Sequence, residues 1–73
     1  MSRRLTALIH REDDVYVALC PEFDNASQGA LIEEARDNLR EALELFLECA
    51  SPDEIEERWH TDVLITQVEV SGG

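Results

Sequence analysis

Apolar residues recur at steps of three and four along residues 30–50, the longest periodic stretch of the chain. Side chains at such steps lie on one side of a helix with 3.6 residues per turn, so the spacing predicts one long amphipathic helix. Its predicted buried stripe consists of Ile32, Ala35, Leu39, Leu43, Phe46 and Ala50. Mostly charged side chains fill the opposite side, and the helix therefore needs another element on which to bury the stripe.

Four shorter stretches have the alternation or the β-branched content of strands. They cover residues 3–10, 15–20, 26–28 and 62–70. The charged residues 11–14 predict a turn after the first strand, and Pro21 ends the second because proline cannot donate to an interior ladder. Residues 51–54 contain the serine, proline and glutamate of a favourable helix start, which predicts a short second helix ending near Arg58.

This order of elements predicts a two-layer α+β fold in a single domain over residues 1–73. An antiparallel sheet in the order β-β-β-α-β, with a short extra helix before the last strand, is covered on one face by the long helix. A chain of this length buries only about 60% of the surface that it exposes when unfolded, so the predicted core is thin.

Several predicted strands carry apolar residues on both faces, whereas one helix covers only one face of a sheet. Leu45 and Cys49 also extend the apolar surface of the long helix beyond its main stripe. Excess apolar surface on two elements predicts an oligomer or partner interface. The residues expected there are Leu8, Tyr16, Ala18, Leu45, Cys49, Val63 and Ile65.

The sequence contains seventeen acidic and six basic residues, which gives a formal net charge of −11. Such a surface repels phosphate backbones, so direct binding to nucleic acid is not expected and a basic protein partner is favoured. The charge also suits a protein that simply stays in solution. No apolar run approaches the roughly 20 residues of a membrane span, and the start of the chain lacks the pattern of a leader, so the expected location is the cytoplasm with reduced thiols.

No residues in the sequence have the spacing of a catalytic or metal-binding motif. A zinc site built from His10, Cys20, Cys49 and His60 matches no compact ligand pattern, and a buried apolar role suits the cysteines better. We therefore expect no catalytic residues, no cofactor and no metal.

An ordered set of local features gives the sequence a family resemblance. An acidic turn precedes a strand with an aromatic residue, Tyr16, and the step Pro21-Glu22-Phe23 follows that strand. Then come a small-polar-Gly turn at residues 27–29 and a helix with the pairs Glu34-Ala35, Asn38-Leu39 and Glu41-Ala42. Over residues 4–50 this combination resembles the HicB antitoxin family of bacterial toxin–antitoxin systems.

The resemblance implies a partial RNase-H-like arrangement without catalytic residues and a homodimer or tetramer. It also implies a function: docking on HicA, a small basic ribonuclease that cleaves mRNA, and blocking its active site. The sequence departs from the family at Leu31, where a capping threonine is usual, and no basic DNA-binding segment follows the last predicted strand. The alternative is an orphan self-associating domain with another partner.

Overall fold

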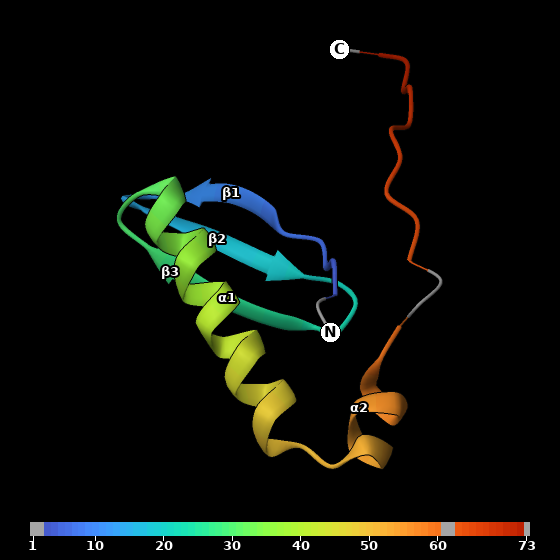
Figure 1. Cartoon of the computed structure of the whole chain (residues 1–73). Coiled ribbons are helices and arrows are strands. Elements are labelled where there is room, and N and C mark those ends of the chain that lie inside the picture. Colours follow the sequence, from blue (N-terminus) through green and yellow to red (C-terminus); the bar gives the residue numbers. More distant parts are fainter. Residues whose placement is uncertain (1–2, 61–62, 73) are drawn as a thin grey trace.

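The computed structural model describes residues 3–60 and 63–72. Three strands form an antiparallel sheet in the order β1-β2-β3, and two helices follow (Figure 1). The elements are β1 (Leu8–Glu12), β2 (Val15–Cys20), β3 (Asn25–Gly29), α1 (Ile32–Cys49) and α2 (Pro52–Arg58). The α+β class, the antiparallel meander and the covering helix are confirmed.

The hairpin between β1 and β2 is closed by a two-residue turn. Glu12 pairs with Val15, and Asp13 adopts a φ of 53°, a left-handed conformation that aspartate tolerates better than most residues. The first strand therefore lies later than predicted, because the ladder begins where Leu8 meets Leu19. Residues 3–7 are not part of a strand, and the Thr6 amide bonds instead to the Glu22 side chain beyond the end of β2.

The first half of α1 lies directly against β3. A Cβ atom on Gly29 would approach the Ala35 nitrogen to 2.6 Å, so only glycine permits this close approach. The Asn38 side chain donates a hydrogen bond of 2.9 Å to the Gln28 carbonyl and so covers part of the outer edge of β3. As predicted, Leu31 provides no side-chain cap for the helix.

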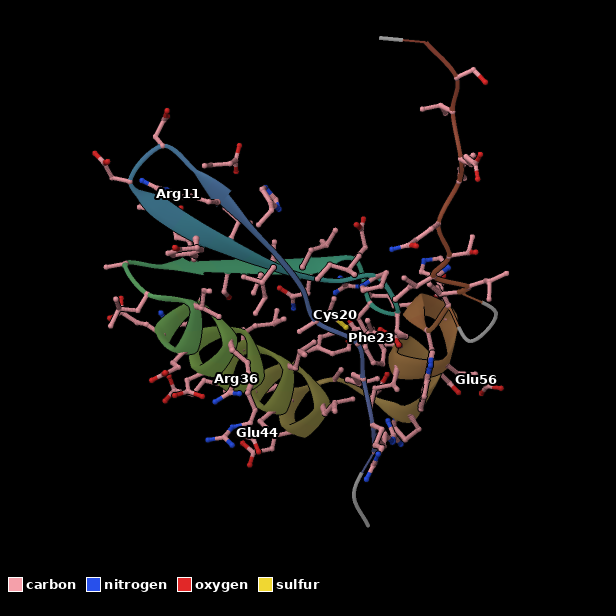
Figure 2. All side chains as sticks on the ribbon, turned by 90° about the horizontal axis from the view of Figure 1, so that it is seen from above. Arg11, Cys20, Phe23, Arg36, Glu44 and Glu56 are labelled. Carbon is pink, nitrogen blue, oxygen red and sulfur yellow. The ribbon has the colours of Figure 1, made fainter. Side chains whose placement is uncertain are left out.

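The core lies between the sheet and α1. Its buried apolar residues are Ala18, Cys20, Phe23, Ala35, Leu39 and Leu43. Figure 2 shows Cys20 and Phe23 in this layer. Ile32 was predicted to share the buried stripe, but it is the first residue of α1 and is 52% exposed, so the stripe begins one turn later.

The two faces of β2 differ in burial. Ala18 and Cys20 are buried beneath the helices, and Tyr16 on the same face packs against the core. Leu19 and Val17 point to the other face, where no helix covers them in the described part of the chain. Because Ala18 is fully buried, its predicted place at an interface is wrong, and the exposed sheet face is formed by its neighbours in the sequence.

Residues 63–72 form no strand with any described residue, so the prediction of a last strand at residues 63–70 is wrong. The segment is exposed throughout and runs away from the sheet (Figure 1), and we call it the C-terminal arm. Asp62, the first residue of the predicted strand, lies outside the described residues. A strand requires a neighbouring ladder as well as a suitable sequence, and the arm does not reach its own sheet.

Candidate protein-binding surfaces

The turn over residues 21–24 fixes the segment around Thr6 and the end of α2 to the sheet. The Glu22 carboxylate accepts hydrogen bonds from the Thr6 amide at 3.0 Å and from the Thr6 hydroxyl at 2.6 Å. The Glu22 carbonyl accepts a third from the His60 amide at 2.7 Å. Residue 22 thus joins three segments that lie far apart in the sequence.

Aromatic contacts extend the same junction. The Phe23 ring lies 5.4 Å from the centroids of both Phe46 and Trp59. The Arg58 guanidinium stacks over Phe46 at 4.6 Å and donates a hydrogen bond to the Phe23 carbonyl. Arg3 stacks over Trp59 at 4.7 Å. These contacts hold α2 in one position on the body of the protein.

The junction also changes the titration of two side chains. Burial acts to raise the pKa of the Glu22 carboxyl, but the hydrogen bonds from Thr6 stabilise its charged form, so the resulting pKa lies below the ordinary value. Burial raises the pKa of the Cys20 thiol, and the neighbouring Glu22 raises it further. The thiol therefore stays protonated at neutral pH and donates to Glu22 over 3.4 Å.

A hollow of about 800 Å³ separates residues 3–7 from α1 and α2. Its floor is apolar and includes Leu5, Leu39, Leu43, Leu47 and Ile55. Four arginines line it, namely Arg3, Arg4, Arg36 and Arg40. The chain has only six basic residues, so most of its positive charge is gathered around this one apolar hollow.

The surface of α1 opposite the core is acidic. Five exposed carboxylates at helical spacing form what we call the acidic stripe: Glu33, Asp37, Glu41, Glu44 and Glu48. Helix α2 adds four more exposed carboxylates: Asp53, Glu54, Glu56 and Glu57. In Figure 2, Glu44 and Glu56 project outward from their two helices. Within the described residues, the single ion pair on the stripe joins Asp37 to Arg36 at 3.8 Å.

The structure separates the residues that the sequence analysis grouped into one interface. Leu8 lies on the first strand, next to Leu19 on the uncovered sheet face. Leu45 and Cys49 are exposed on α1. The last two members, Val63 and Ile65, belong to the C-terminal arm, while Tyr16 and Ala18 face the core.

The four residues that were weighed as zinc ligands are also dispersed. Cys20 is buried in the core and Cys49 is exposed at the end of α1. His10 lies 3.4 Å from Glu12 on the first strand, whereas the His60 backbone is tied to the turn. Among the described residues, no group of three or more His, Cys, Asp or Glu side chains is placed to hold a metal ion.

Sequence reasoning missed the hollow and the junction. The arginines at positions 36 and 40 are one helical turn apart, which places them on the same side of α1. That spacing was a usable signal for the hollow. The hydrogen bond between Thr6 and Glu22 joins residues 16 positions apart in the sequence, and no periodic pattern predicts such a contact.

These features define a small α+β protein with an open three-stranded sheet, an acidic helical surface and an extended arm. None of the described helices has both the length and the apolar character that a membrane crossing requires. Comparison with protein-family models, curated proteins and solved structures finds no match to the chain.

Proposed function

We propose that this chain is an antitoxin-like binding module that neutralises a small basic ribonuclease of the HicA type by docking on it. The observation that carries the proposal is the acidic stripe. It places five exposed carboxylates along one side of α1, and a single arginine, Arg36, pairs with one of them among the described residues.

Carboxylates in such a row favour a partner that has an RNA-binding surface. A ribonuclease that grips phosphates presents a basic surface, and a row of carboxylates offers it a similar pattern of negative charge. Two of the chain's own arginines lie beside the stripe, since Arg36 pairs with Asp37 and lines the hollow together with Arg40 and Glu44. Docking at the stripe would both hold the ribonuclease and exclude its RNA.

The order of the elements also supports the proposal. Three antiparallel strands followed by a long covering helix are what the resemblance to HicB antitoxins leads us to expect, and we propose that this part of the chain is a partial RNase-H-like arrangement. The junction at residues 21–24 gives the Pro-Glu-Phe step of the resemblance a structural role, since Glu22 and Phe23 hold the body together.

The proposal expects a small basic protein to be encoded in the neighbouring reading frame, and the test purifies that protein and titrates it with the full chain by calorimetry. We expect a dissociation constant in the nanomolar range, or about −12 kcal/mol, that weakens as salt is added. RNA cleavage by the basic protein should stop at a one-to-one ratio. The double variant Glu41→Lys with Glu48→Lys should weaken binding by roughly a hundredfold, because it reverses two of the five charges of the stripe.

The matched control is Glu12→Lys with Asp14→Lys, which changes the net charge equally at the β1–β2 hairpin. We expect this variant to bind within about threefold of the parent, since only overall attraction is reduced. Equal losses in both variants would show that net charge, and not the stripe, drives association. A chain that neither binds the neighbouring protein nor stops its cleavage of RNA would reject the antitoxin role and favour the orphan self-associating domain.

A further inference from the structure

The C-terminal arm has the composition of a buried strand, yet most of its large apolar side chains are exposed. Leu64, Val68 and Val70 are each about 80% exposed, whereas Val63, at the start of the arm, is 38% exposed. Most residues from 63 to 70 are apolar or β-branched. Apolar residues occur at both odd and even positions, so both faces of a strand formed by this segment would be apolar. Such a sequence suits a strand that is covered on both faces. The exposed apolar side chains of the arm therefore lack a surface on which to pack.

The sheet has one open edge. Strand β3 is covered in part by α1 and by the bond from Asn38 to Gln28. Strand β1 lies at the other edge, and α1 touches it least of the three strands. Every second residue of an edge strand directs its amide and carbonyl away from the sheet. In the described part of the chain, no backbone group bonds to that outer edge.

The hollow lies beside the same edge. Residues 3–7 form one of its walls and lead directly into β1. A strand that pairs with β1 and continues along residues 3–7 would therefore reach over the hollow, whose floor is apolar. The arm fits this position, because Leu64, Val68 and Val70 share one parity and would face the same side of the extended sheet.

Charge favours the same pairing. Two copies of a chain with a net charge of −11 repel each other over most of their surfaces. The hollow is lined by four arginines, whereas the side chains of residues 63–72 include a single charge, that of Glu69. The arm and the hollow are therefore the two surfaces through which a second acidic copy can approach with least repulsion.

The arm does not reach its own β1. The chain before the arm is held at the junction as far as His60, by the bond from His60 to Glu22 and by the packing of Trp59 on Phe23. From there it runs away from the sheet (Figure 1). The radius of gyration is 14.3 Å, against about 11 Å for a compact chain of this length, and the longest extent is 48 Å.

We propose that the arm of one copy adds as a fourth strand to the outer edge of β1 in a second copy, above the hollow, and that the exchange is reciprocal. In a twofold dimer of this kind, the outer backbone groups of β1 in both copies are hydrogen-bonded, and each arm is buried against the other copy. It leaves the acidic stripes outside the exchanged strands. The inference does not depend on the proposed ribonuclease partner.

The first experiment measures the mass of the full chain in solution by light scattering between about 1 and 100 µM, together with the variant Leu64→Glu, Val68→Glu. We expect a dimer for the parent, and a dissociation constant raised by roughly a hundredfold or more for the variant. Because Leu64 and Val68 are each about 80% exposed in the single chain, the variant should keep the helical circular dichroism of the body. A monomeric parent at 100 µM would overturn the proposal.

The matched control is Gln67→Glu with Ser71→Glu, which adds the same charge to the opposite parity of the arm. We expect it to dimerise within about tenfold of the parent. If Leu45→Glu on α1 abolishes the dimer and the arm variant does not, the interface lies on the helix and the proposal is wrong.

A second experiment distinguishes exchange from closure of the arm on its own sheet. Equal amounts of isotope-labelled and unlabelled chain are mixed, and nuclear Overhauser contacts are collected only between different molecules. The proposal requires contacts between the amides of β1 and the side chains of the arm in this filtered spectrum. Arm contacts seen only within one molecule would show that the arm folds back, which overturns the exchange.

Discussion

Phe23 and Leu64 are both large apolar side chains, yet Phe23 is 1% exposed and Leu64 is 83% exposed. Phe23 lies in the turn at residues 21–24, where side chains from three segments meet. Leu64 lies in the C-terminal arm, which forms no strand with the described residues. The large apolar side chain in the body of the protein is therefore buried by contacts within one chain, whereas the one in the arm is not.

The difference teaches that local sequence determines the shape of a segment but not its partner. The arm is extended, as its alternation predicts, and still forms no strand, because a strand is a property of two segments. The body gains its stability from contacts between residues far apart in sequence. Changes in the body should therefore alter the folding of a single chain, and matched changes in the arm should alter only association.

The largest effect should come from Phe23→Ala. Removing a fully buried ring costs about 3–5 kcal/mol, which approaches the whole stability of a small domain, so we expect the variant to be largely unfolded at 37 °C. Urea denaturation followed by circular dichroism measures it. The counterpart Leu64→Ala should change the unfolding free energy of dilute, dissociated chains by less than about 0.5 kcal/mol. Equal losses would mean that the arm packs on its own body.

Gly29→Ala should have the next largest effect. The added methyl group would lie 2.6 Å from the Ala35 nitrogen, and backbone cannot move aside as a flexible side chain does. We expect a loss of about 1–3 kcal/mol as α1 is pushed away from β3. In the arm, Gly72→Ala meets nothing within 4 Å, and thermal unfolding of the body should not change. A neutral Gly29→Ala would contradict the close contact of the helix with the sheet.

The helix over residues 32–49 and the start of the short helix at Ser51 could be predicted because both depend on neighbouring residues. The sheet order followed from the turns. The faces of β2 could not be assigned, since both are apolar and only the position of α1 decides that Ala18 is buried and Leu19 is not.

The acidic stripe was visible in the sequence, because the helical period places its carboxylates together. The hollow depends on residues 3–7 lying beside α1, and the Thr6–Glu22 bonds that hold them there leave no repeating signal. The same limit applies to the arm. The alternation of residues in the arm predicted a strand. No local pattern indicates which strand, in the same chain or in another, would pair with it.

Glu22→Gln tests the junction through pH. The pKa of Glu22 is lowered in the folded chain, so its contribution is fully present above the ordinary carboxyl value of about 4.3 and is lost as pH falls through the lower folded value. We expect the parent to lose stability in that acidic range and the variant to lose less there. At pH 7 the variant should be weaker by about 1–2 kcal/mol, because the charged acceptor of Thr6 is gone.

Urea denaturation of both chains from pH 3 to 7 measures this difference. The arm supplies the control, since Glu69→Gln removes an exposed carboxylate and should leave the pH profile of the body unchanged. A parallel loss of stability in the parent and in Glu22→Gln on acidification would show that other carboxylates control the acid transition.

The smallest expected effect is a gain, from Leu31→Ser. Leu31 occupies the cap position of α1 in extended backbone and provides no oxygen, whereas Ser51 caps α2 by accepting from the Glu54 amide at 3.2 Å. Serine at position 31 should stabilise the body by about 0.5–1 kcal/mol, seen as a higher urea midpoint with an unchanged slope. Leu31 is 62% exposed, so little packing is lost. A loss of stability that appears only at concentrations where the chain is dimeric would mean that Leu31 is covered by the second copy, and the interface would then extend from the arm to the start of α1.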